Sequence, residues 1–431
     1  MNGSHTQIIV PDLPLSYSRE KNHNKIKEVS FRKLVPEITR STYGAFGLYR
    51  YPAKFIPQVV ASILKKYGDK NMKLLDPFAG CGTTGLVSKT FGYDYELWDL
   101  NPMLKVIHSV ATTEPLKIDI EKIIEDMQLS KTTYTPPWSN LSYWFPEEFL
   151  PLLKQVWGYY HTLNESYTKR ILVLPLLKTT RKFSYNDEQR QKLSKSPLTV
   201  KRVEKLLRSD WKKIFFDSIR IEIQTTIKKL DEYQKILPKP NHVKSKVIAG
   251  LDVIDIPRAI IDSQKWDAII TSPPYLQAQE YIRNSKMDLF WLGYNEEAIR
   301  SLSKKELPYR VVKPIPIFSK TYQKYHEMIK ENHLKQMFEN YFNGVLGTLT
   351  TISYHVSKYL FIFVGQSSVR AVPIPIDGIF TEHFGSLGWK HLFTLSDKIP
   401  SRVMFKSKKN PATGLKDVRI SKENLVVLKR I

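Results

Sequence analysis

The sequence predicts an α/β fold in which a mostly parallel sheet is covered by helices and interrupted by a mainly helical insertion. Apolar strands alternate with helical stretches in two separate parts of the chain, which is the order expected of a parallel sheet. A glycine-rich corner joins the first predicted strand to the helix that follows it. Between the two parts, glycine nearly disappears while basic and aromatic residues dominate, which indicates the insertion.

The first part begins with a helix over residues 53–68, where Pro57 suits the first helical turn. A short strand over 72–75, a helix from Leu86 and a strand over 93–102 follow. The second part resumes with strands over 246–257, 266–271 and 357–365. Two alternating runs over 389–409 predict a closing antiparallel hairpin.

We therefore divide the chain into five segments. They are an N-terminal arm (1–42), the first half of the sheet domain (43–115), a helical basic insertion (116–245), the second half of the sheet domain (246–405) and a basic C-terminal tail (406–431).

The composition is that of a globular and strongly basic protein. The 431 residues are 42% hydrophobic and carry a formal net charge of +24. Such an excess favours a polyanionic partner, and nucleic acid is the first candidate. Cys81 is the single cysteine, so we expect no disulfide framework and no metal site. The chain has no long apolar run and no signal-like start, so we expect no membrane partner and a cytoplasmic location.

Much of the positive charge lies in the insertion. Residues 151–246 hold 22 Lys and Arg against 9 Asp and Glu, interleaved with Tyr, Trp and Phe. This mixture suits phosphate contacts together with base contacts, so we interpret the insertion as a possible DNA-recognition domain. Its longest helix, over 209–237, has Ser209 or Asp210 as N-cap. A rival DNA-binding segment is the basic, proline-punctuated stretch 301–328.

The glycine corner has the pattern Gly80-x-Gly82-x-x-Gly85, with Asp99 at the end of the next strand. This pattern favours a nucleotide-like ligand over a helix N-terminus, although a packing turn explains the glycines equally well. Asp76 precedes the corner and would repel a pyrophosphate, whereas it would attract an ammonium or a sulfonium. S-adenosylmethionine carries both cations and a ribose for Asp99, so it is favoured over NAD. Asp252 ends the third strand and is a candidate for an adenine amino group.

Taken together, these motifs resemble the DNA amino-methyltransferases of restriction–modification type over residues 43–115 and 246–405. "DPFAGCGTT" is similar to their cofactor motif, "TSPPY" to their catalytic motif and "YPAKFIP" to their F-x-P motif. "WDLNP" and "AGLD" fall where the family contacts ribose and adenine, and "VGQSSVRAVPIPIDGIF" is similar to a late region of the N4-cytosine branch. The long insertion departs from the usual spacing of the family.

The resemblance implies a Rossmann-like class I methyltransferase sheet and S-adenosylmethionine as the methyl donor. It implies catalytic roles for Ser272, Pro273, Pro274 and Tyr275. It implies cofactor contacts by Lys54, Phe55, Pro57, Asp76, Pro77, Phe78, Ala79, Gly80, Gly82, Thr83, Thr84, Asp99, Leu100, Asn101 and Asp252. The expected partners are double-stranded DNA and a possible separately encoded restriction endonuclease.

The expected reaction is direct methyl transfer to the exocyclic N4 of a flipped cytosine, because N4-cytosine members mostly carry Ser at the position of Ser272. Ser272 and the Pro273 carbonyl would accept the amine protons, and Tyr275 would stack on the base. The two corners must then face each other at one edge of the sheet. Alternatives are an adenine-N6 or RNA base methyltransferase, an NAD-dependent oxidoreductase and a non-catalytic DNA-binding protein. Arg283 either contacts a phosphate or lies on a solvated helix face, and we favour the solvated face.

Overall fold

The structure is a computed structural model that describes residues 26–187, 190, 192–238, 242–262, 264–276, 280–370, 372–399 and 421–431. It contains an eight-stranded sheet with the strand order β4-β3-β2-β5-β6-β10-β9-β1. The strands are β1 (Ile26–Val29), β2 (Lys73–Asp76), β3 (Asp94–Asp99), β4 (Ser245–Ala249), β5 (Trp266–Thr271), β6 (Val356–Gly365), β9 (Trp389–Lys398) and β10 (Lys422–Arg430). A small separate hairpin pairs β7 (Ser367–Val369) with β8 (Val372–Ile374).

Most neighbouring strands in the large sheet are parallel. The run from β4 through β3, β2 and β5 to β6 is parallel throughout. β10 is the exception, because it lies antiparallel between β6 and β9, with Val426 opposite both Ile362 and Thr394. The predicted Rossmann-like α/β sheet, mostly parallel with an antiparallel pair near the C-terminus, is confirmed.

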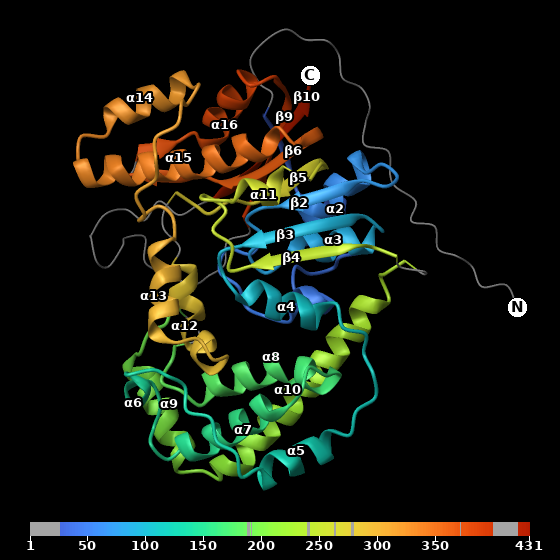
Figure 1. The fold of residues 1–431 in the computed structure, drawn as a ribbon, viewed down its shortest axis with the longest axis vertical. Coiled ribbons are helices and arrows are strands. Elements are labelled where there is room, and N and C mark those ends of the chain that lie inside the picture. The colour runs from blue at the N-terminus through green and yellow to red at the C-terminus, as the bar shows by residue number, and fades with distance from the viewer. Residues whose placement is uncertain are drawn as a thin grey trace, which may run out of the picture.

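Helices cover both faces of the sheet, because successive residues of a strand point to opposite sides. In β5, Ile270 belongs to one hydrophobic core and Ile269 to the other. α2 to α4 pack on the first face and α15 and α16 on the second, with α14 outside them (Figure 1). The helices of the sheet domain are α1 (Phe31–Leu34), η1 (Gly44–Gly47), α2 (Pro57–Tyr67), α3 (Thr83–Thr90), α4 (Met103–Ala111), α11 (Arg258–Ile261), α12 (Tyr281–Trp291), α13 (Glu296–Lys304), α14 (Lys320–Met328), α15 (Asn332–Ser353) and α16 (Ile376–Gly385).

In the part of the predicted insertion that the structure describes, six helices lie together at one end of the molecule (Figure 1). They are α5 (Ile120–Leu129), α6 (Leu141–Trp144), α7 (Leu150–Thr162), α8 (Tyr167–Lys182), α9 (Pro197–Leu207) and α10 (Trp211–Gln234). Asp210 is the N-cap of α10, and its carboxylate accepts the Lys213 N–H at 3.3 Å. Within the described ranges, no helix combines the length and the apolar character needed to cross a bilayer.

The predicted N-terminal arm and C-terminal tail are wrong in part, because each segment contributes a strand to the sheet. β1 pairs with β9, and Phe31 behind it is fully buried, so residues 26–42 are not an arm. β10 lies inside the predicted tail yet occupies the interior of the sheet. β10 is a short apolar run bordered by charged residues, whereas β1 alternates apolar and charged residues over Ile26–Val29. Both strands gain their partners only from the tertiary fold. The second run of the predicted hairpin lies outside the described residues from position 400 onward, and the antiparallel neighbour of β9 is β10.

Helix α12 connects the insertion to the sheet domain through a buried ion pair. The Asp288 side chain is 1% exposed and accepts hydrogen bonds from Nε and Nη2 of Arg181, in α8, at 2.7 and 2.9 Å. Arg181 Nη2 also donates to the Asn284 carbonyl at 2.7 Å. The Tyr49 hydroxyl donates to the same carboxylate. The pair therefore holds α8 against α12, directly behind the cleft described below.

We expect the Arg181→Met variant to lose about 3–5 kcal/mol in free energy of unfolding, because it leaves the Asp288 charge buried without a cationic partner. Lys178→Gln is the matched control, since Lys178 also lies in α8 but pairs at 2.9 Å with Glu222 inside the insertion, at a partly exposed site. Lys178→Gln should lose less than about 1 kcal/mol in free energy of unfolding. Urea unfolding measures both values, and equal losses would contradict the assigned role of the Arg181–Asp288 pair.

Candidate active site

The glycine corner and the S-P-P-Y corner lie at the same edge of the sheet. β2 and β5 are parallel neighbours, with Leu75 opposite Ile269. The residues that follow these strands therefore leave the sheet side by side, at the edge where open α/β sheets bind their ligands. The first corner begins at Asp76 and the second at Thr271.

The glycines of the first corner meet separate steric demands. Gly80 and Gly82 have φ angles of 56° and 80°, a left-handed conformation that residues with a Cβ rarely adopt. Gly85 lies in α3, where a Cβ would stand 2.5 Å from the Tyr95 ring on β3. Gly85 thus permits close packing of helix on sheet, whereas Gly80 and Gly82 shape the turn beside the cleft.

A buried carboxylate ties the two corners together. Asp76 is 1% exposed, and its Oδ1 accepts a hydrogen bond from the Thr271 hydroxyl at 2.6 Å. Its Oδ2 accepts one from the Thr84 hydroxyl at 2.6 Å, and the Phe78 N–H donates to Oδ1 at 3.1 Å. Burial raises the pKa of Asp76 to about 6, although these hydrogen bonds act in the opposite direction. Asp76 therefore joins the end of β2, the start of α3 and the end of β5.

The second carboxylate, Asp99, organises the end of β3. Its Oδ2 accepts the Gly80 N–H and its Oδ1 the Asn101 N–H, each at 2.7 Å. Burial is the largest cause of a pKa raised to about 7 for Asp99. The Asn101 side chain donates to the Ser285 hydroxyl at 3.0 Å, which links this strand end to α12.

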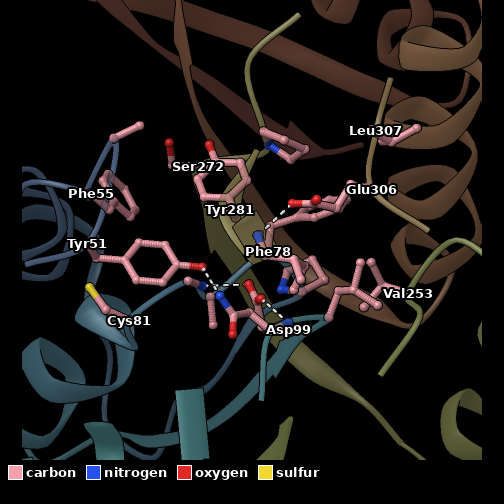
Figure 2. Close-up of a pocket in the computed structure, with 18 of the residues that line it drawn as sticks. Tyr51, Phe55, Phe78, Cys81, Asp99, Val253, Ser272, Tyr281, Glu306 and Leu307 are labelled. Atoms are coloured by element: carbon pink, nitrogen blue, oxygen red, sulfur yellow. Dashed lines mark hydrogen bonds between the residues drawn. The ribbon is translucent and has the colours of Figure 1, made fainter. Parts of the chain in front are cut away.

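Gly80, Asp99 and Asn101 line one cleft together with Ser272. Figure 2 shows this cleft, with Ser272 above Asp99 and Glu306 on the opposite wall from Tyr51. Twelve of the residues predicted from the sequence line it: Lys54, Phe55, Pro77, Phe78, Ala79, Gly80, Asp99, Leu100, Asn101, Asp252, Ser272 and Pro274. The predicted cofactor residues and the predicted catalytic serine thus share a single cavity. Cys81 also lines it and is free and largely buried.

Seven predicted site residues are absent from the lining of this cleft: Pro57, Asp76, Gly82, Thr83, Thr84, Pro273 and Tyr275. Pro57 begins α2, and Thr83 and Thr84 begin α3, so they support the corner from behind. The Tyr275 ring packs against Gly365, and its hydroxyl donates to Glu423 Oε1 on β10 at 2.5 Å. Burial and the Glu423 charge raise the pKa of Tyr275 far above its ordinary value.

Sequence reasoning missed ten residues of the lining: Tyr51, Ala53, Cys81, Val253, Ile254, Tyr281, Ile282, Lys305, Glu306 and Leu307. Tyr51 and Tyr281 form a stacked pair across the cleft, with ring centroids 5.9 Å apart. Both tyrosines could have been found from their positions in the sequence, since Tyr51 begins the "YPAKFIP" motif and Tyr281 follows the S-P-P-Y motif closely. No local pattern marks Lys305, Glu306 or Leu307, which the fold brings in from the end of α13.

Glu306 is a buried carboxylate that lines the cleft opposite Tyr51. It is 9% exposed, and its Oε1 accepts the Ile282 N–H at 2.9 Å, so it caps the first turn of α12 from outside the helix. Burial raises its pKa to about 7, with smaller contributions from the nearby charges of Glu280 and Asp99. Protonation of Glu306 therefore changes the charge of the group that caps α12, the helix that carries Tyr281.

Asp252 lines the cleft, and its carboxylate pairs with Arg310, a residue that was not among the predicted site residues. Arg310 Nη1 donates to Asp252 Oδ1 at 2.7 Å and to Oδ2 at 2.8 Å. Lys305 Nζ lies 3.9 Å from the same carboxylate. Among the residues that the structure describes, no cluster of three His, Cys, Asp or Glu side chains is arranged to hold a metal ion.

Comparison with known proteins identifies two relatives of this chain. It is 24% identical over 415 residues to the Type II methyltransferase M.MvaI of Kocuria varians, covering 88% of this chain and 89% of that protein. It is 26% identical over 378 residues to the Type II methyltransferase M.BsoBI of Geobacillus stearothermophilus, covering 81% of this chain and 72% of that protein. No protein-family model matches the chain.

Among solved structures, the chain is similar to the rRNA methyltransferase aviRa from Streptomyces viridochromogenes, with 12% identity and a TM-score of 0.29. The similarity covers 89% of this chain and 88% of the other. A TM-score this low says nothing about the fold or the substrate of the present protein.

Replacing Glu306 with Gln should remove a pH-dependent loss of stability. Because burial raises the pKa of Glu306 from 4.5 to about 7, the unfolded state releases this proton at lower pH than the folded state. The wild type therefore loses stability as pH rises through this window, and the variant does not. We expect the variant to gain free energy of unfolding over the wild type as the pH rises to about 7, reaching roughly 1–3 kcal/mol. Above that pH the difference should stay constant, and urea unfolding at a series of pH values measures it.

Glu297→Gln, on the exposed side of α13, is the control for loss of a carboxylate that does not line the cleft. Parallel stability curves for Glu306→Gln and the wild type would show that the buried carboxylate does not titrate in this window.

Proposed function

We propose that the protein is a site-specific DNA methyltransferase that transfers a methyl group from S-adenosylmethionine to the exocyclic N4 of cytosine in duplex DNA. The main support is the single cleft that Ser272 and Pro274 share with Gly80, Asp99 and Asn101. The two relatives, both Type II methyltransferases, align with most of the chain and support the same type of chemistry.

The donor groups of the cleft fit S-adenosylmethionine. Asp99 offers carboxylate oxygens to the ribose hydroxyls, and its raised pKa falls when a cation approaches. Phe78 and Val253 offer apolar surface to the adenine ring, while Phe55 lies nearer Ser272 (Figure 2). Lys54 also lines the cleft. When bound, S-adenosylmethionine supplies an electrophilic methyl group on a sulfonium centre.

Ser272 and Pro273 act on the acceptor nitrogen, whose lone pair is delocalised into the base. The Ser272 hydroxyl and the Pro273 carbonyl each accept one N–H, which orients the lone pair toward the methyl group. The N–C bond forms as the C–S bond breaks, S-adenosylhomocysteine leaves, and the nitrogen releases a proton to solvent, either directly or through the Ser272 hydroxyl. This route uses no covalent enzyme intermediate, so Cys81 has no nucleophilic role.

Cytosine N4 is favoured over adenine N6 because Ser272 occupies the position at which N6-specific members of the resembled family mostly carry Asp or Asn. The exocyclic amine is inaccessible inside a duplex, so the target base is flipped into the cleft. The basic insertion provides the charge for DNA binding. A cytoplasmic location and a separately encoded restriction endonuclease belong to the same proposal.

We expect Ser272→Ala to lower the rate of methyl transfer at least about 100-fold, because the amine is no longer oriented. The dissociation constant for S-adenosylmethionine should change by less than about twofold, since the serine acts on the acceptor. Tritium transfer to bacteriophage DNA and calorimetric titration of the cofactor measure the two effects. Ser386→Ala, at an exposed helix end, is the control. Transfer at the wild-type rate in Ser272→Ala would remove the serine from the mechanism.

We further expect DNA treated with the wild-type protein and S-adenosylmethionine to yield N4-methylcytosine on hydrolysis to nucleosides. Liquid chromatography with mass spectrometry separates this product from N6-methyladenine. Recovery of N6-methyladenine alone would overturn the cytosine assignment and keep the cleft chemistry. Methyl transfer to transfer RNA but not to duplex DNA would overturn the DNA assignment.

A further inference from the structure

A second cavity lies between the insertion and α12–α13, next to the catalytic cleft. Its volume is about 640 Å³, and Glu306 lines both cavities, so the two are neighbours. One wall comes from the α6 region of the insertion and the other from α12, α13 and Tyr309. Pockets of roughly 300–1,000 Å³ commonly hold ligands of nucleotide size.

Stacked aromatic rings form the wall on the insertion side. Trp138 stacks on Phe290 with centroids 4.6 Å apart and planes at 11°, and on Trp144 at 6.0 Å and 22°. Tyr143 meets the Trp144 ring edge-on at 5.1 Å and is 55% exposed. The stack is thus anchored in the core by Phe290 and ends at exposed aromatic surface, where one more flat ring would extend it.

The facing wall carries three cations and three carboxylates. Arg283 and Lys286 project from α12 and Arg300 from α13. Glu280 lies 2.6 Å from Lys192 Nζ and 3.2 Å from Arg283 Nη1. Glu296 accepts the Ser139 N–H at 2.7 Å and lies 4.0 Å from Arg300 Nη2. Lys286 forms no ion pair with the residues that the structure describes, and its Nζ lies 5.8 Å from the centroid of the Phe290 ring.

Aromatic surface that faces Lys286 and the two solvent-exposed arginines suits a nucleic acid strand that has left the duplex stack. A paired base already stacks on its neighbours and cannot stack on protein rings, whereas an unstacked base can, and its phosphate needs cations. We propose that this cavity binds an unstacked nucleotide of the DNA strand, beside the base that enters the catalytic cleft. Its base lies on the Tyr143–Trp144 surface and its phosphate on Arg283, Lys286 and Arg300. This inference rests on the proposed DNA methyltransferase function.

The test uses a fluorescein-labelled oligothymidylate of about ten nucleotides, within the usual site size of single-strand binding proteins. Fluorescence anisotropy at several salt concentrations gives its dissociation constant for the full chain. The wild type should bind it, and Tyr143→Ala should weaken binding about tenfold through lost stacking, with the salt dependence unchanged. Tyr143→Phe should bind as the wild type does, because the ring is retained.

Arg300→Gln separates phosphate contact from stacking. It should weaken binding and also lower the slope of log affinity against log salt by about 0.7, the value for one phosphate contact on a single strand. Tyr354→Ala is the matched control, because Tyr354 is 64% exposed but precedes β6 at the opposite edge of the sheet. Tyr143 and Arg300 are exposed, so their variants should fold as the wild type does.

Failure of the oligothymidylate to bind the wild type, or wild-type binding by both Tyr143→Ala and Arg300→Gln, would overturn the cavity assignment. The same variants assayed with bacteriophage DNA separate this result from the proposed function. A wild type that methylates the DNA, with variants that keep its KM for DNA, refutes only the cavity. A wild type that transfers no methyl group refutes the proposed function and, with it, this inference.

Discussion

The arrangement of the site depends on the hydrogen bonds that the buried Asp76 carboxylate accepts. Its hydrogen bonds to Thr271 and Thr84 join the last residue of β2 to the residue before Ser272 and to the first turn of α3. Sheet pairing alone brings β2 and β5 together, but it does not determine how the two loops leave the edge. With one buried acid holding both, the glycine corner and the S-P-P-Y corner keep a common geometry.

Helix α12 connects the two corners to the insertion. At successive turns it presents Tyr281 to the cleft, Ser285 to Asn101 and Asp288 to Arg181 of α8. Its exposed side contributes Arg283 and Lys286 to the second cavity. One helix thus contacts the proposed cofactor site, the proposed strand-binding cavity and the basic insertion proposed to bind DNA.

Local signals in the sequence were enough to predict the strand ends and the residues on them. Glycine, proline and short apolar runs marked the two corners, and Asp99, Asn101 and Ser272 line the cleft where they were expected. Burial was not predictable: Asp76 was expected to meet a cation, yet its partners are two threonines. Tyr281 and Glu306 reach the cleft only through the packing of α12 and α13, and β10 enters the sheet from a segment whose flanking charges suggested a tail.

A crystal structure of the protein with sinefungin, in which an amine replaces the methyl group of S-adenosylmethionine, shows whether the two corners act on one ligand. We expect the ribose to lie on Asp99, the adenine to lie between Phe78 and Val253, and the sinefungin amine to point at the Ser272 hydroxyl. A ligand bound outside this cleft, or one whose amine points away from Ser272, would contradict the claim that the two corners form one methyl-transfer site.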